Sequence, residues 1–327
     1  MARVTSRDVA REAGVSQTTV SFVLNDRSDQ TISDATRQAV LGAARRLGYV
    51  PSGAARSLRK GRSSVVLCVL PDLPVAQAME EFKLTLSGVL GESGLTCVFL
   101  HDVAGLPLAQ LWPDVHPAVV VAFGGLTAAD AKRIRNAGIA LIDGLFDQQG
   151  TAITGLDQAD VGAMQVQHLA ARGHTRIGFG AVRDPREAAF CDPRMRGAQQ
   201  ACRELGLPQP VVQALDYTAA DGLDAVRRWT ASPEQVTAIA AFNDLVGLAV
   251  LAGARAAGIT VPADLAVIGV DNLPAAALAE PPLTTIAFDA TVSARTLARR
   301  VLAEAGVTAP PPEPLGPALR LIPGSTT

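Results

Sequence analysis

The sequence has no long, uncharged apolar run. No stretch reaches the roughly 18 residues that a membrane-spanning helix needs, and the first eight residues contain no apolar core of a signal peptide. Its 4 cysteines are scattered without CxxC spacing. This argues against a disulfide framework and against a zinc site of that kind. We therefore expect a cytoplasmic protein with no membrane anchor.

The motifs of nucleotide-dependent and hydrolytic enzymes are also missing. No GxGxxG follows the first expected strand, and GxxxxGK[ST], GxSxG and HExxH are absent. The 4 histidines lack the spacing of metal ligands, and nothing marks Cys191, expected in a loop, as a nucleophile. We expect no catalytic site, no metal and no cofactor.

Charge is distributed unevenly along the 327 residues. Residues 1–62 hold 11 basic and 5 acidic residues, whereas the remainder holds 18 basic and 26 acidic ones. A basic segment attached to an acidic body indicates that only the segment meets a polyanion such as nucleic acid. Ordinary solvated charge on small helices is the alternative. The length predicts two or three domains.

Residues 5–25 read as two short helices joined by a tight turn. Thr5 suits an N-cap, Gly14 permits a left-handed turn, and Ser16 suits the second N-cap. This pattern predicts a helix-turn-helix, whose second helix enters the DNA major groove. The side chains expected to point outward are Gln17, Thr18, Ser21 and Phe22. From this stretch alone, a small helical hairpin in a core remains an alternative.

A third helix is expected over residues 33–48, followed by a basic linker over residues 52–64. Residues 54–59 of the linker suit a short helix that folds only when something holds it. An exposed Leu58 among small and basic residues has the chemistry of a minor-groove wedge. A flexible basic tether explains the linker equally well.

From residue 65 onward, apolar strands alternate with amphipathic helices, which predicts doubly wound parallel sheets. The expected strands are 65–70, 96–100, 118–123, 140–142, 177–181, 211–215, 238–242 and 265–270, and the expected helices include 162–171, 194–205, 247–257 and 290–305. Two such lobes in tandem imply a ligand cleft between them, at the carboxyl ends of the strands. Polar residues follow several strands, although most such residues are turn or cap residues.

Taken together, these pieces resemble the LacI/GalR family of transcriptional repressors over nearly the whole chain. The motifs that carry the resemblance lie at residues 8–10, 14–16, 19–21, 24–25, 47–51, 55–58, 169–177, 243–244, 261–271 and 282–286. The resemblance implies an all-α helix-turn-helix head and an α/β body whose two lobes resemble periplasmic sugar-binding proteins. The implied divisions are 1–50 for the head, 51–63 for the hinge, 64–157 with about 287–317 for the N-terminal lobe, and 158–286 with about 318–327 for the C-terminal lobe.

The resemblance further implies a ligand-controlled repressor that binds a near-palindromic DNA operator as a homodimer. The implied DNA-binding residues are Thr5, Ser16, Gln17, Thr18, Thr19, Ser21, Phe22, Asn25, Tyr49, Ala55, Arg56 and Leu58. The implied effector, a sugar or related metabolite, would be bound by Asp157, Arg194, Tyr217, Asn243, Asp271 and Phe288.

The chain departs from the family pattern at several positions. Phe22 stands where most members carry Arg, and Phe offers a base only an apolar contact. Phe288 replaces a common Gln, and residues 73–75 lack a common aromatic. The Pro-rich end lacks tetramerising heptads, which favours a dimer. A transporter's solute-binding protein and an α/β enzyme are the alternatives. The basic head argues against the first, and the missing phosphate loop against the second.

Overall fold

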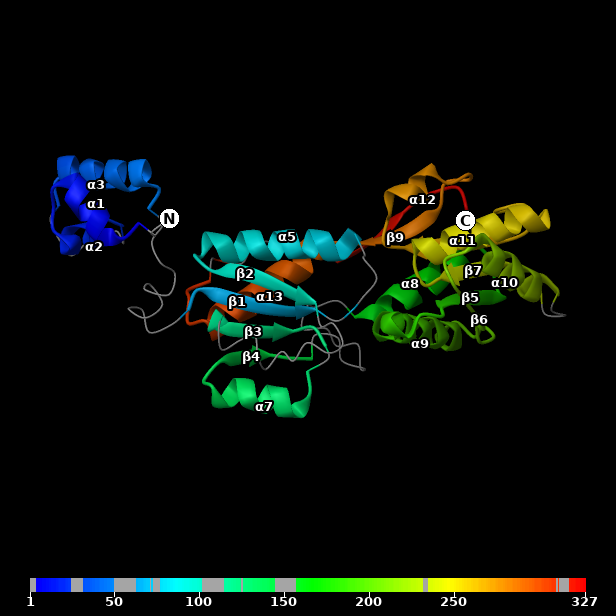
Figure 1. Ribbon diagram of the computed structural model, residues 1–327. Helices are drawn as coiled ribbons and strands as arrows, with labels where there is room; N and C mark the ends of the chain where they lie inside the picture. The colour runs from blue at the N-terminus through cyan, green and yellow to red at the C-terminus, as the bar shows by residue number, and fades with distance from the viewer. Residues whose placement is uncertain are drawn as a thin grey trace. The chain divides into compact units, whose positions relative to one another are not determined.

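The computed structural model describes residues 4–24, 32–49, 63–70, 72, 77–101, 115–124, 126–144, 157–231, 235–309, 311 and 318–327. Contacts divide the chain into two compact units, Met1–Ser64 and Val65–Thr327. Figure 1 labels the helices and strands of both units. No helix among the described residues is long and apolar enough to cross a membrane.

The first unit is a bundle of three helices: α1 (Ser6–Ala13), α2 (Gln17–Leu24) and α3 (Asp34–Leu47). Its small core gathers Val9, Val20 and Val40, which are all fully buried. Small and β-branched side chains let the short helices approach closely, and this brings the predicted helix-turn-helix together.

The ends of these helices follow the capping pattern expected from the sequence. The Asp8 carboxylate accepts from the Thr5 backbone N–H (2.9 Å) and hydroxyl (2.7 Å). Ser16 Oγ accepts from Thr19 N at 3.0 Å, and Ser33 Oγ accepts from Thr36 N at 3.2 Å. Gly14 has φ 66°, the left-handed conformation that glycine adopts at low cost. The predicted caps and turn are therefore confirmed.

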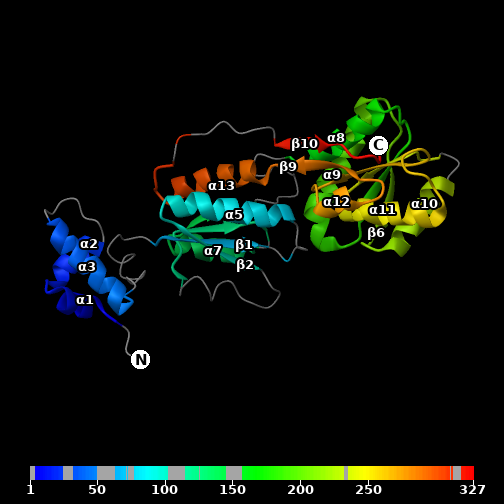
Figure 2. The ribbon, with the colours of Figure 1, turned by 90° about the horizontal axis from the view of Figure 1, so that it is seen from above.

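Within the second unit, the first lobe contains a four-stranded parallel sheet in the order β2-β1-β3-β4. Its strands are β1 (Val65–Leu70), β2 (Thr96–His101), β3 (Val119–Ala122) and β4 (Ala140–Ile142), and its helices are α5 (Gln77–Glu92), α7 (Ala128–Asn136) and α13 (Ala290–Glu304). Helices α5 and α13 lie side by side on one face (Figure 2), where Leu86, Leu297 and Val301 share one core. Ile134 of α7 packs on the other face.

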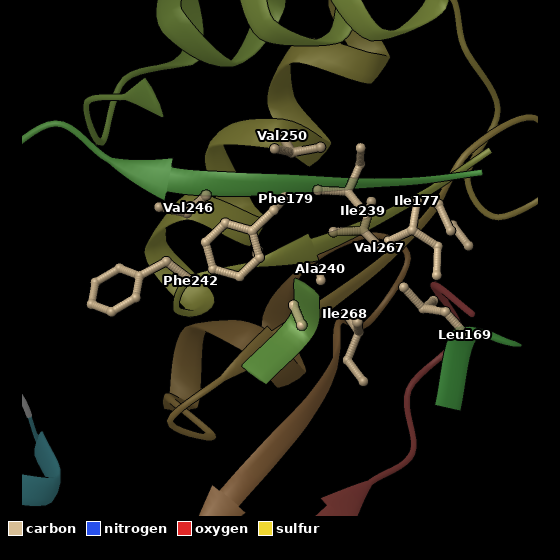
Figure 3. Close-up of a cluster of buried hydrophobic side chains, with 14 of the residues drawn as sticks. Leu169, Ile177, Phe179, Ile239, Ala240, Phe242, Val246, Val250, Val267 and Ile268 are labelled. Atoms are coloured by element: carbon tan, nitrogen blue, oxygen red, sulfur yellow. The ribbon is translucent and has the colours of Figure 1, made fainter. Parts of the chain in front are cut away.

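The second lobe contains a six-stranded sheet in the order β10-β9-β8-β7-β5-β6. Its strands are β5 (Ile177–Val182), β6 (Val211–Leu215), β7 (Ala238–Ala241), β8 (Ala266–Val270), β9 (Thr284–Phe288) and β10 (Leu319–Ile322). Its helices are α8 (Gln158–Ala171), the 3-10 turn η2 (Pro185–Glu187), α9 (Ala188–Glu204), α10 (Ala219–Ala231), α11 (Asp244–Ala257) and α12 (Pro274–Leu278). Figure 3 shows Phe179 and Ile239 of the sheet beside Val246 and Val250 of α11.

Helices α8 and α9 pack with almost no space between their backbones. A Cβ atom added to Gly162 of α8 would lie 1.8 Å from the Arg194 carbonyl oxygen of α9. A Cβ on Gly197 of α9 would lie 1.8 Å from the Ala159 carbonyl oxygen of α8. Glycine is thus required on both helices, and the contact fixes the position of Arg194 relative to α8.

The last described residues are bonded into the second sheet. The backbone C=O of Thr326 accepts from Val267 N at 2.8 Å, and its hydroxyl donates to the Val267 carbonyl at 2.6 Å. That hydroxyl also accepts from Thr284 N at 2.8 Å, and Arg172 donates to the Thr327 carbonyl at 2.8 Å. Residues 319–327 are therefore integral to this lobe.

The structure corrects several local expectations. Helix α9 begins at Ala188 rather than at Arg194, and Cys191 is buried within it rather than placed in a loop. Pro193 lies inside this helix, where it removes one backbone donor without ending the helix. Strands β9 and β10 and helix α12 were not expected from apolar patterning, and β10 runs antiparallel to β9. Most of the Pro-rich end lies outside the described residues.

Candidate functional site

The outer surface of α2 carries the polar side chains that the sequence assigned to it. Gln17 and Thr18 are exposed, whereas Ser21 and Phe22 are half-buried. The Gln17 amide is already oriented, because its Nε2 donates to Ser6 Oγ at 2.8 Å and its Oε1 accepts from Arg7 Nε at 3.4 Å. Such an amide presents both a donor and an acceptor, the chemistry that reads adenine in the major groove.

The other described residues predicted to touch DNA help to build the unit itself. Thr5 and Ser16 are the N-caps of α1 and α2, and Thr19 Oγ1 lies 2.8 Å from Ser16 Oγ. Tyr49 packs against the small core after α3 ends. Four predicted DNA-binding residues lie outside the described residues: Asn25, Ala55, Arg56 and Leu58.

The second lobe holds a buried arginine at the carboxyl ends of its strands. Arg194 of α9 is 3% exposed. Its Nη1 donates to the Phe242 carbonyl at the end of β7 at 2.7 Å, and its Nε donates to Gln158 Oε1 at 2.8 Å. The guanidinium also lies near two aromatic rings, 5.0 Å from the centre of Phe242 and 5.9 Å from that of Phe288. These contacts hold the cation in one orientation.

Asp271 faces this arginine from the end of β8. Its Oδ1 lies 3.7 Å from Arg194 Nη2, beyond hydrogen-bonding distance but within the range of an ion pair. Burial raises the pKa of Asp271 to about 6, and the Arg194 charge acts in the opposite direction. Burial likewise lowers the pKa of Arg194, while Asp271 favours the charged guanidinium. The pair thus retains hydrogen-bonding capacity that a hydroxylated ligand would satisfy.

A second group of polar side chains lies at the ends of the neighbouring strands. Tyr217 donates its hydroxyl proton to Glu187 Oε1 at 2.6 Å and accepts from Asn243 Nδ2 at 2.9 Å. Asn243 Oδ1 also caps α11 by accepting from Val246 N at 2.9 Å. Burial raises the pKa of Glu187, and burial with the Glu187 hydrogen bond raises that of Tyr217. The Asn243 side chain is thereby held at the N-terminus of α11, and its amide in turn orients the Tyr217 hydroxyl.

The structure brings some of the predicted effector residues together and gives another a capping contact. Arg194, Asp271 and Phe288 form one group, and Tyr217 and Asn243 form the second. The Asp157 carboxylate instead caps α8, accepting from Ala159 N at 2.8 Å. The sequence analysis missed three contributors, which are Gln158, Glu187 and Phe242. Gln158 and Phe242 adjoin the predicted residues Asp157 and Asn243, but nothing in the sequence indicated their roles or that of Glu187.

Carboxylates neutralise two further arginines at these strand ends. Arg183 pairs with Asp216 and, at 3.1 Å, with Asp221. Arg186 pairs with Asp184 at 2.6 Å and with Asp72 at 3.2 Å. Within the part of the chain that the structure describes, no group of three or more His, Cys, Asp or Glu side chains is arranged to hold a metal ion.

The chain matches two family models. Residues 5–52 match the model of bacterial regulatory proteins of the lacI family, and residues 166–327 match the periplasmic binding protein-like domain. It is 31% identical over 311 residues to the HTH-type transcriptional regulator CelR of Thermobifida fusca, covering 91% of this chain and 90% of that protein.

Solved structures show the same architecture. A transcriptional regulator CelR–cellobiose complex matches with a TM-score of 0.64 and 27% identity over 99% of this chain and 100% of the other. The lac repressor dimer bound to operator and the anti-inducer ONPF matches with a TM-score of 0.79 and 22% identity over 99% of both chains. With its capped helix-turn-helix and its two parallel-sheet lobes, this chain belongs to the LacI family and is a DNA-binding transcriptional regulator.

Proposed function

We propose that the protein is a repressor whose affinity for its DNA operator is controlled by a small hydroxylated metabolite bound in the second lobe. The observation that carries this proposal is the Arg194–Asp271 pair, which lies at the carboxyl ends of parallel strands and is flanked by aromatic rings. Sites at these strand ends are the usual ligand positions of such sheets. The repressor role is supported by the lac repressor dimer among the similar structures.

On the DNA side, the exposed Gln17 and Thr18 read bases, and Ser16 and Thr19 contact the phosphate backbone at the start of α2. Phe22 meets a thymine methyl where an arginine would select guanine. Two copies of the head on a near-palindrome require a homodimer. We retain the division into a head (1–50), a hinge (51–63) and two lobes (64–157 with about 287–317, and 158–286 with about 318–327) as part of this proposal.

For the effector, the surrounding charges favour an uncharged ligand over an anion. Arg194 is only 3% exposed, and Arg183 and Arg186 are each paired with two carboxylates. Among the described residues at these strand ends, the cations are already buried or paired, so a phosphate or carboxylate group would meet acidic neighbours at a large desolvation cost. A sugar offers hydroxyl groups to Asp271 and Arg194 and an apolar ring face to Phe288 and Tyr217. A similar structure contains cellobiose.

The test uses the full-length protein and a pool of randomised duplexes, from which bound DNA is selected and sequenced. We expect a near-palindromic site whose affinity changes when a sugar from a thermal-shift panel is added. Equal binding to selected and scrambled duplexes, with and without every sugar and nucleoside tried, would contradict the proposal. Phosphorylated sugars in the same panel test the charge argument, and we expect them to leave the melting temperature unchanged.

A second experiment addresses the hinge. Replacing Leu58 with Ala should weaken operator binding because the apolar wedge that opens a base step is lost. Effector affinity should stay nearly as in the wild type and serves as the internal control. If the variant binds the operator as tightly as the wild type, Leu58 is not a wedge.

A further inference from the structure

The backbone that carries Asp271 adopts an unusual conformation. Asp271 has φ 104° and its neighbour Asn272 has φ 52°, and neither residue is a glycine. Residues with a side chain occupy this left-handed region at a cost, so the surroundings must hold them there. This turn is what brings the Asp271 carboxylate to 3.7 Å from Arg194.

Three consecutive backbone N–H groups of the turn are each held by a different acceptor. Asp271 N donates to the Ile286 carbonyl at 2.9 Å. Asn272 N donates to Thr285 Oγ1 at 3.3 Å, and Leu273 N donates to Asp244 Oδ2 at 2.7 Å. Two of the three acceptors are therefore side chains, which substitution can remove.

These two side chains are joined to each other. The Thr285 hydroxyl donates to Asp244 Oδ1 at 2.6 Å, so that both carboxylate oxygens of Asp244 are occupied. Asp244 is completely buried at the start of α11. Its carboxylate fits only because β8 has a glycine beside it, since a Cβ on Gly269 would lie 2.2 Å from Asp244 Oδ1. The fold thus accommodates a buried carboxylate that touches no solvent.

We propose that Asp244 is a positioning residue for the effector site, which holds the 271–273 turn through Thr285 and Leu273 and so keeps the Asp271 carboxylate facing Arg194. This proposal rests on the proposed function, because it assumes that Asp271 meets the effector. Asp244 itself does not touch the ligand.

The positioning contact depends on pH. Asp271 and Arg194 are the charged groups that act on Asp244, from β8 and α9, and Glu187 acts in turn on Asp271. Burial raises the pKa of Asp244 to about 7, with the Thr285 and Leu273 bonds acting in the opposite direction. Only the carboxylate accepts hydrogen bonds at both oxygens without competition from its own proton. Effector affinity therefore falls as the pH falls through 7.

The test compares wild type, Asp244→Asn, Thr285→Val and Thr285→Ser as full-length proteins, with cellobiose as the binding probe at pH 8 and pH 6. An amide supplies one acceptor oxygen and valine none, whereas serine retains the hydroxyl. Hydrogen exchange of the 271–273 amides reports the turn directly, and calorimetry reports cellobiose affinity. Thermal melting shows whether each variant is folded, and the Thr285 pair serves alone if Asp244→Asn does not fold.

At pH 8 we expect the 271–273 amides to exchange about tenfold faster in Asp244→Asn and Thr285→Val than in the wild type. We expect the same two variants to bind cellobiose about tenfold more weakly, whereas Thr285→Ser matches the wild type. The affinity of Asp244→Asn should also change less between pH 8 and pH 6. The proposal would be overturned if Asp244→Asn and Thr285→Val both kept wild-type protection of these amides and wild-type affinity for cellobiose. If the variants expose the turn but the wild type does not bind cellobiose, the positioning role stands and the choice of sugar in the proposed function is wrong.

Discussion

At the scale of single residues, the second lobe is organised around one buried cation. In place of water, the Arg194 guanidinium contacts the Phe242 carbonyl, the Gln158 side-chain amide and the face of the Phe242 ring. A buried charge is tolerated only when it is paired and hydrogen-bonded, and removing one partner leaves the other uncompensated. The same side chain therefore contributes to stability and, in the proposed function, to recognition of the effector.

Replacing Arg194 with Met should lower the free energy of unfolding by about 3–5 kcal/mol, because Asp271 loses its counter-charge inside the lobe. Denaturant unfolding measures the change. Arg203→Met on the exposed end of the same helix is the matched control, with an expected change within about 0.5 kcal/mol. Similar losses in the two variants would show that Arg194 has no special structural role.

The contribution of Asp244 and Asp271 to stability should fall as the pH rises from about 4 to about 7. Burial raises the folded-state pKa of Asp244 to about 7 and of Asp271 to about 6, both above the ordinary aspartate value of 3.8. The folded state then binds more protons than the unfolded state in this window, so raising the pH favours unfolding. Asp244→Asn should flatten the decline in melting temperature, whereas a change at the exposed Asp224 should leave it intact. An unchanged slope in Asp244→Asn would contradict the prediction.

At the scale of elements, the second lobe depends on helices that touch backbone to backbone. Gly162 and Gly197 let α8 and α9 approach until no side chain fits between them. Because Arg194 lies on the contact surface of α9, the approach of the two helices also sets the position of its guanidinium. Packing between α8 and α9 thus shapes the proposed effector site.

Gly162→Ala should force α8 and α9 apart, lower the unfolding free energy by about 3 kcal/mol, and weaken effector binding. Gly88→Ala on the exposed surface of α5 is the control, because a Cβ there meets nothing within 4 Å. That change should stabilise the protein by about 0.5–1 kcal/mol through better helix propensity. Equal stability of the two variants, measured by thermal unfolding, would refute the close-packing argument.

Local signals made some elements predictable and hid others. Thr5, Ser16 and Ser33 revealed helix starts because capping depends on a few adjacent residues. The true start of α9 was hidden, since Pro193 suggests a break and only packing against α8 overrides it. In the site, Asp271 was predictable as a polar residue that follows a strand, and Arg194 was predictable only through the family resemblance. Glu187 and Gln158 were not, because their roles depend on contacts distant in sequence.

At the scale of the whole molecule, the charge distribution separates two tasks. Residues 1–62 are basic and the remainder is acidic. Repulsion between the acidic remainder and DNA leaves the basic segment as the part that approaches the phosphates. In the proposed function, specific recognition rests on a few side chains of α2, superimposed on an electrostatic attraction that does not depend on sequence.

Operator affinity should fall by about 10³-fold or more between 50 and 200 mM salt, because each phosphate contact releases counterions on binding. Fluorescence anisotropy with a selected duplex measures this slope. Effector affinity, which rests on a buried ion pair and an uncharged ligand in the proposed site, should change little over the same range. A flat salt dependence of operator binding would contradict a phosphate-contacting head.

The bonding of Thr326 and Thr327 into the second sheet has a consequence for biosynthesis. The strands of that lobe begin at Ile177, yet its sheet reaches its full bonding only when residues 319–327 are present. During synthesis on the ribosome, backbone groups of β8 and β9 therefore lack their final hydrogen-bond partners until residues 319–327 emerge. Unpaired strand edges of this kind favour aggregation, so completion of the last residues protects the lobe from it.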